Sequence, residues 1–134
     1  MDQVDNTLLN IGIIAIVDDD EPLREGLDSV LKAAGFAVAT FPSAEAFLDS
    51  PRRQSIVCLI VDIRLPGMSG IELQRRLLAV SSPVPIIFIT AHGDATLREM
   101  VMQAGAAGFL TKPVRRDTLL QQIHTALRSH PDSR

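Results

Sequence analysis

The stretch Ile56-Val57-Cys58-Leu59-Ile60-Val61-Asp62 is apolar at every position until it ends in a carboxylate. A continuous apolar run of this length is typical of a strand that is covered on both faces of a parallel sheet. Residues 11–17 form a similar run, which is followed by Asp18, Asp19 and Asp20. Because the carboxyl ends of parallel strands meet at one edge of a sheet, the two runs together predict acidic side chains at that edge.

Outward from these two runs, segments of strand length alternate with segments of helical period. The expected strands are 11–17, 36–40, 56–61, 86–90 and 107–111. The first expected helix ends at Gly35, and the second extends from its cap Ser43 to near Pro51. The third begins with the capping box of Ser69 and Glu72, and the fourth begins after Asp94 and ends near Gly105. The fifth carries four apolar residues in helical register, Leu119, Leu120, Ile123 and Leu127. This alternation predicts an α/β, flavodoxin-like (βα)5 fold, with a doubly wound parallel five-stranded sheet in the order 2-1-3-4-5.

Length and composition indicate one compact domain over residues 1–134. The hydrophobic content is 46%, and the mean hydropathy is +0.20. The net charge of −3 and the pI of about 5.5 argue against direct binding of nucleic acid. The single cysteine, Cys58, lies inside an apolar run, which predicts a buried strand residue in a reducing cytoplasm. We find no signal peptide or membrane span, and we interpret the polar residues 129–134 as a tail or the start of a linker.

Thr90 and Lys112 follow the fourth and fifth apolar runs, so the same edge is expected to gather acids, a hydroxyl and an ammonium. Converging carboxylates repel one another, and Mg²⁺ relieves that repulsion because it prefers oxygen ligands and also accepts phosphate oxygens. A carboxylate in such a site can attack phosphorus and form an acyl phosphate. An acidic residue that opens a helix is often only an N-cap, and we assign that role to Asp20, with Pro22 in the first turn.

Four motifs of this kind occur in a fixed order and at characteristic spacings. They are Val17–Pro22, Asp62–Gly70, Ile89–Asp94 and Gly108–Pro113. Together they resemble the receiver domain of two-component response regulators (the CheY-like receivers), over residues 11–128. The residues around Arg64 and around His92 are most similar to the FixJ/NarL-type transcriptional regulators.

The resemblance implies a role for each matching residue. Asp62 would be the phosphoacceptor, and the cofactor would be Mg²⁺. Asp19 and Asp62 would bind the metal directly, Asp18 would act through a bound water, and the backbone carbonyl of Arg64 would be a further ligand. Thr90 and Lys112 would bind the phosphoryl group, Phe109 would change rotamer on activation, and Lys112-Pro113 would be a cis peptide. The side chains of Arg64 and His92 would tune the lifetime of the phosphoryl group.

The resemblance also implies partners and a mode of switching. A sensor histidine kinase would supply the phosphoryl group, and the surface of the fourth helix, fifth strand and fifth helix would change on activation. That surface would control a C-terminal DNA-binding output domain or another partner, or would form a homodimer. The protein would be cytoplasmic, without direct nucleic-acid or membrane binding, and would catalyse only its own phosphorylation and dephosphorylation. Arg115 and Arg116 at the start of the last helix oppose the helix dipole, and their role is open.

The sequence leaves three alternative functions open. The chain could be a stand-alone receiver that drains phosphoryl groups from a kinase or binds a partner. Asp18 and Asp20 have the D-x-D spacing of phosphatases with an aspartate nucleophile, but a cap segment and a late acidic pair are missing. A flavin-binding electron carrier of the same fold would need hydroxyls and glycines after the first strand, where this chain has carboxylates.

Overall fold

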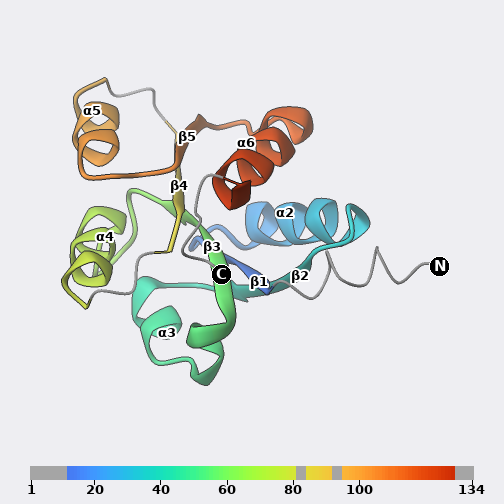
Figure 1. Ribbon diagram of the computed structural model, residues 1–134, viewed down its shortest axis with the longest axis horizontal. Coiled ribbons are helices and arrows are strands. Elements are labelled where there is room, and N and C mark those ends of the chain that lie inside the picture. Colours follow the sequence, from blue (N-terminus) through green and yellow to red (C-terminus); the bar gives the residue numbers. More distant parts are fainter. Residues whose placement is uncertain (1–11, 81–83, 92–94, 129–134) are drawn as a thin grey trace.

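The computed structural model describes residues 12–80, 84–91 and 95–128. These residues form one five-stranded parallel sheet in the order β2-β1-β3-β4-β5, which confirms the predicted winding (Figure 1). The elements in chain order are β1 (Ile13–Val17), α2 (Glu21–Ala33), β2 (Ala37–Phe41), α3 (Ala44–Leu48), the 3₁₀ helix η1 (Pro51–Ser55), β3 (Ile56–Asp62), α4 (Gly70–Ala79), β4 (Ile86–Thr90), α5 (Ala95–Gln103), β5 (Gly108–Thr111) and α6 (Arg116–Arg128).

Helices cover both faces of the sheet and create two separate cores. Helices α2 and α6 pack on one face, and α3, α4 and α5 pack on the other (Figure 1). The alternation of side chains along each strand assigns neighbouring residues to opposite cores, so that Ile16 and Ile60 pack with α2 and α6, whereas Val17 and Val61 pack with α3, α4 and α5. This two-sided burial explains why the central strands are continuously apolar.

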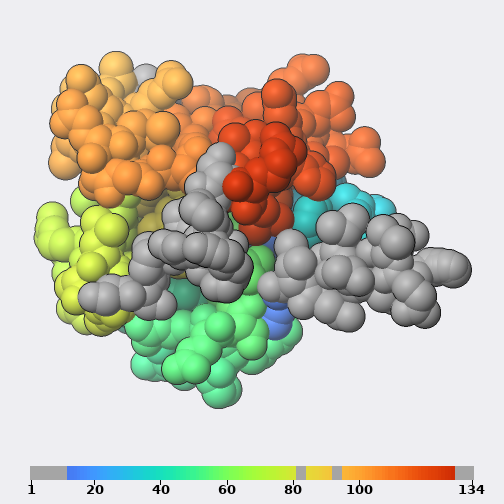
Figure 2. All heavy atoms as spheres, in the orientation of Figure 1, coloured from blue at the N-terminus to red at the C-terminus, as the bar shows by residue number. Residues whose placement is uncertain are grey.

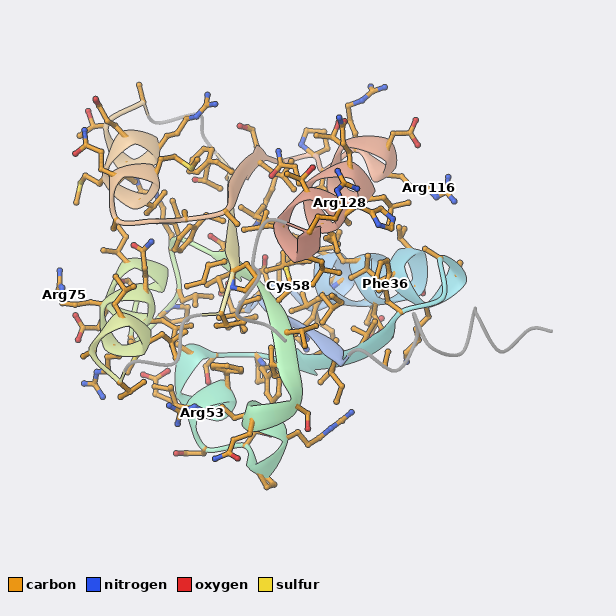
Figure 3. All side chains as sticks on the ribbon, viewed as in Figure 1. Phe36, Arg53, Cys58, Arg75, Arg116 and Arg128 are labelled. Carbon is orange, nitrogen blue, oxygen red and sulfur yellow. The ribbon has the colours of Figure 1, made fainter. Side chains whose placement is uncertain are left out.

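Cys58 shows the depth of this interior. Its side chain is fully buried in the middle of β3 (Figure 3), and burial raises the pKa of its thiol to about 12. The predicted burial of this cysteine within a strand is therefore confirmed. Among the described residues, no helix combines the length and the apolar character needed to cross a membrane.

Several boundaries differ from those expected, each for a local reason. The strand β2 begins at Ala37 rather than Phe36, because the Phe36 N–H donates to Leu31 O at 3.0 Å and closes the end of α2, with Gly35 at a φ of 99°. It extends to Phe41 because Phe41 O accepts from Asp18 N at 3.1 Å. Strand β3 likewise includes Asp62, strand β1 begins at residue 13 and strand β5 at residue 108.

The second helix was predicted to extend from its cap Ser43 to near Pro51. In the structure α3 ends at Leu48, and a separate 3₁₀ helix, η1, begins at Pro51. Ser50 makes this turn favourable, because its hydroxyl accepts from Arg52 N at 3.1 Å and Pro51 fits the first helical position. Elsewhere Ser43 accepts from Ala46 N at 3.0 Å, and Ser69 accepts from Glu72 N at 3.1 Å, so both serines cap their helices as predicted. The Glu72 carboxylate accepts from Arg75 and Arg76, so the structure shows the serine half of the predicted capping box.

Candidate functional site

The acidic residues Asp18 and Asp62 lie side by side because their strands are neighbours in register. Val17 of β1 pairs with Val61 of β3, so the next residue of each chain segment reaches the same point of the sheet edge. Both carboxylates are buried there, with exposed fractions of 1% for Asp18 and 6% for Asp62. The adjacent Asp19 is exposed, and a carboxylate oxygen from each of the three residues lies within 4.8 Å of the others.

Lys112 supplies the positive charge of this site from the loop that follows β5, the strand beyond β4 in the sheet. Its peptide N–H donates to Thr90 O at 2.8 Å, and a cis peptide to Pro113 follows, as the resemblance implied. The ammonium Nζ then donates to Asp62 Oδ2 at 2.7 Å and lies 3.5 Å from Asp18 Oδ2. The structure thus unites the acidic residues with Lys112 at one point, as the sequence predicted.

The orientation of the Asp62 carboxylate is fixed from two sides. While Oδ2 accepts from Lys112, Oδ1 accepts from the peptide N–H of Arg64 at 2.9 Å. Gly70 packs against the same strand end so closely that a Cβ placed there would lie 2.6 Å from Asp62 O. A carboxylate held in this way loses little freedom when it reacts, which favours attack on a bound electrophile.

The electrostatics of the site reflect an excess of negative charge. Burial raises the pKa of Asp18; the peptide N–H of Asp20 opposes that rise, and the charge of Asp62 adds to it. Burial by itself lowers the pKa of the Lys112 ammonium, but the hydrogen bond that Lys112 donates to Asp62 and the charges of both acids outweigh this effect, so that the pKa of Lys112 is raised. Lys112 is therefore a permanent cation facing two buried carboxylates.

The donor set fits a hard divalent cation. Three carboxylates face one ammonium, and Asp18 Oδ2 is a buried oxygen without a hydrogen-bond donor in the described part of the chain. Apart from the ion pair with Lys112 Nζ at 3.5 Å, this oxygen has lone pairs that are available to a further partner such as a metal ion. Mg²⁺ uses one or two carboxylates and keeps several waters, which matches one exposed and two buried carboxylates.

Thr90 and Phe109 lie where the sequence placed them, on adjacent strands. Thr90 ends β4 and is buried. Phe109 is half-buried on β5, where its ring packs against the α3, α4 and α5 core. The same ring borders a surface cavity of about 350 Å³ beside α5, and the guanidinium of Arg98 lies 5.8 Å from its centroid. Phe109 is thus neither a fully enclosed core residue nor a solvated one.

Other predicted residues lie at the margin of the site or elsewhere. Asp20 caps α2 by accepting from Leu23 N at 3.2 Å, which confirms the predicted N-cap. The side chain of Arg64 is exposed, and His92 lies outside the described residues. Arg116 at the start of α6 extends outward, with 63% of its side chain exposed (Figure 3). The role of Arg115 and Arg116 stays open.

Two contacts around the site were not foreseen. The Arg24 guanidinium donates to Asp18 O at 2.6 Å and braces the acidic strand end from α2. The carboxylate of Glu45 on α3 accepts from the peptide N–H of Met68 at 2.9 Å. These partners are 6 and 23 residues apart in sequence, and no motif connects them. Only the packing of α2 and α3 against the sheet reveals them.

Comparisons with known proteins agree with this geometry. The family model of the response regulator receiver domain matches residues 14–124. Response regulator protein TodT of Pseudomonas putida is 42% identical over 122 residues, which cover 91% of this chain and 54% of TodT. Transcriptional regulatory protein FixJ of Bradyrhizobium diazoefficiens is 44% identical over 117 residues, which cover 87% of this chain and 57% of FixJ.

Solved structures give the same result. The structure of the response regulator StyR superposes with a TM-score of 0.82 at 47% identity, and the match covers 90% of this chain and 61% of StyR. The chain spans about half the length of the curated relatives that it matches.

Proposed function

Because the chain belongs to the family of response regulator receiver domains, we propose that it is a phosphorylatable signalling switch that accepts a phosphoryl group on Asp62. The observation that carries this proposal is the buried Asp62 carboxylate, held by Lys112 Nζ at 2.7 Å and Arg64 N at 2.9 Å beside the acid pair. Receiver domains are signalling proteins rather than classical enzymes, and this one would act only on its own phosphorylation and dephosphorylation.

The proposed reaction is phosphoryl transfer from a phosphohistidine of a sensor kinase. An oxygen of the Asp62 carboxylate forms the new bond to phosphorus as the bond from phosphorus to the histidine nitrogen breaks, and the imidazole leaves with the electron pair. Lys112 and the Thr90 hydroxyl would hold the phosphoryl oxygens. Attack by water on phosphorus later releases inorganic phosphate and regenerates the carboxylate.

Mg²⁺ would be held by Asp19 and Asp62 directly, by Asp18 through water and by the backbone carbonyl of Arg64. When bound, it would neutralise the charge of the acidic cluster and of the transferring group. The protein's part is to gather the three carboxylates within 4.8 Å of one another and to keep Lys112 Nζ 2.7 Å from Asp62 Oδ2.

The direct test uses a small phosphodonor, acetyl phosphate, in the presence of Mg²⁺. We expect the intact protein to gain the mass of one phosphoryl group, and we expect peptide mapping to place that group within Asp62–Gly70. Labelling confined to another segment, or no labelling at any donor concentration, would exclude the proposal.

Mg²⁺ should also stabilise the fold through the same carboxylates. At about ten times its dissociation constant, a ligand of the native state contributes about 1.4 kcal/mol, which raises the Tm of a domain of this size by about 4 °C. Asp19→Asn should lose most of this shift, as measured by calorimetry with and without Mg²⁺. Asp20→Asn is the matched control, because it removes the same charge one residue away while asparagine still caps α2. Equal Mg²⁺ responses in the two variants would contradict the assigned ligands.

Switching is proposed to proceed through Thr90 and Phe109 to the surface of α5, β5 and α6. The phosphoryl group would draw the Thr90 hydroxyl, and the Phe109 ring would move into the space that opens. The half-buried position of Phe109 supports this proposal, because a ring that borders a surface cavity beside α5 is not enclosed on all sides by the core. The tuning roles of Arg64 and His92, and dimer formation through this surface, stay predictions.

The downstream role is proposed by similarity alone, because the family match over residues 14–124 describes the receiver domain. TodT and FixJ are named as a response regulator and a transcriptional regulator, and we propose by similarity a cytoplasmic protein that acts through an output domain or a partner. A stand-alone receiver that drains phosphoryl groups is the alternative. The phosphatase alternative is disfavoured, because the second acid of its D-x-D pair, Asp20, faces the N-terminus of α2 instead of the acidic cluster.

A further inference from the structure

The loop between β3 and α4, residues 63–69, carries the proposed Arg64 ligand and is fastened close to both of its ends. At its beginning, the Arg64 N–H donates to Asp62 Oδ1 at 2.9 Å. At its end, the Gly70 N–H donates to Ile63 O at 2.9 Å, and the Ser69 hydroxyl caps α4. Between these points Leu65 is buried in the core, whereas Pro66 and Gly67 are exposed, so the exposed turn is the part of the loop to which another element can add support.

Glu45 of α3 provides that support. Its Oε2 accepts from the Met68 N–H at 2.9 Å, and the same oxygen lies 2.7 Å from the position of a Cβ on Gly67, which has a φ of +75°. The carboxylate therefore lies directly against the turn, where glycine is the residue that fits both the backbone conformation and the space. The Met68 N–H lowers the pKa of Glu45, which keeps the acceptor ionised at neutral pH.

Helix α3 is a rigid support for this contact although it is short. Ala44 and Phe47, which flank Glu45, are fully buried in the core beneath α3, α4 and α5. The Ser43 hydroxyl caps the helix by accepting from Ala46 N at 3.0 Å, and the Phe47 ring meets Phe41 edge to face with centroids 5.6 Å apart. Glu45 thus extends toward the loop from a helix that is anchored in the core by its buried side chains (Figure 2 shows the molecule in the same view as Figure 1, with α3 at the bottom).

We propose that Glu45 is a positioning residue of the phosphorylation site: its hydrogen bond to Met68 N–H holds the β3–α4 loop, and with it the Arg64 carbonyl, in the geometry that binds Mg²⁺. The inference rests on the proposed function. A loop that is already ordered costs less entropy to bring to a metal, so the contact acts on metal affinity and on the phosphorylation rate without touching either reactant.

The test compares three variants that separate the hydrogen bond from the charge. Glu45→Ala removes both, Glu45→Gln keeps an acceptor oxygen without the charge, and Asp49→Ala removes a charge from the opposite end of α3. The measurements are Mg²⁺ affinity by titration, the rate of labelling by acetyl phosphate at limiting Mg²⁺, and hydrogen exchange of the Met68 amide.

Glu45→Ala should weaken Mg²⁺ binding by about three- to tenfold, the range of one hydrogen bond, and should slow labelling in proportion. Its Met68 amide should exchange faster by about tenfold, while the exchange of core amides in β3 stays unchanged. Glu45→Gln should retain most of the wild-type values, and Asp49→Ala all of them. Equal losses in Glu45→Ala and Glu45→Gln, or wild-type behaviour of Glu45→Ala, would overturn the proposal.

The same measurements distinguish a failure of the proposed phosphorylation from a failure of the positioning role of Glu45. If the wild-type protein takes up no phosphoryl group, the proposed function fails, but Mg²⁺ affinity and Met68 exchange still decide whether Glu45 positions the loop. If the wild-type protein is labelled and Glu45→Ala behaves like it, only the positioning role fails.

Discussion

Asp62→Asn is expected to take up no measurable phosphoryl group from acetyl phosphate, a fall in labelling rate of about a hundredfold or more because the nucleophile is lost. Asparagine has the shape of aspartate and keeps one acceptor oxygen, which can accept either from Lys112 or from the Arg64 N–H but not from both. The fold should therefore persist with the loss of one hydrogen bond at the site. The measurement is intact mass spectrometry over a time course with Mg²⁺, alongside circular dichroism of the variant.

The control is a change in the acid pair that leaves the nucleophile in place. Asp18→Asn should slow labelling by about tenfold through weaker metal binding while the label still maps to Asp62. One specific outcome would favour the phosphatase alternative instead. Turnover of a small phosphomonoester that Asp18→Asn abolishes and Asp62→Asn leaves intact would identify Asp18 as the nucleophile and remove the signalling assignment.

The sheet and its edge could be predicted because their signals are local. Continuous apolar runs identify the buried central strands, and a polar residue directly after each run must lie at the carboxyl edge. Val17 and Val61 pair in the parallel register of β1 and β3, so the residues that follow them, Asp18 and Asp62, are neighbours. The strand ends were predicted less accurately. For example, Phe36 was expected to begin β2, but its N–H donates to Leu31 O at the end of α2.

Side-chain contacts between segments that are distant in sequence could not be predicted from the sequence. Whether Lys112 bonds Asp62 or Asp18 depends on side-chain distances of 2.7 and 3.5 Å that no spacing encodes. The hydrogen bond from Met68 N–H to Glu45 depends on how α3 packs against the β3–α4 loop. In the sequence, Glu45 resembles any acidic residue in the first turn of a helix. Motifs thus identify the residues that react, while the residues that position them emerge only from the packing.

Lys112→Met should destabilise the protein in the absence of Mg²⁺ by about 2 to 3 kcal/mol, because it leaves two buried carboxylates facing each other without a cation. The Asp18 and Asp62 side chains are 1% and 8% exposed, so water screens their repulsion poorly, whereas Lys112 itself keeps 21% of its surface in solvent, which limits the effect. In urea this loss should lower the unfolding midpoint by about 1 M.

Two further results identify the cause as charge rather than packing. Mg²⁺ should restore most of the lost stability in Lys112→Met, and Lys112→Arg, which keeps the charge, should lose much less. The deficit should also shrink as the pH falls from neutrality. The pKa of Asp18 is raised in the folded state already with Lys112 present, and removing the cation raises it further, so the folded variant binds a proton more tightly than the unfolded chain and gains stability on acidification relative to wild type. A deficit that is independent of both pH and Mg²⁺ would instead mean that Lys112 acts through the packing of its aliphatic chain, and the electrostatic description of the site would be wrong.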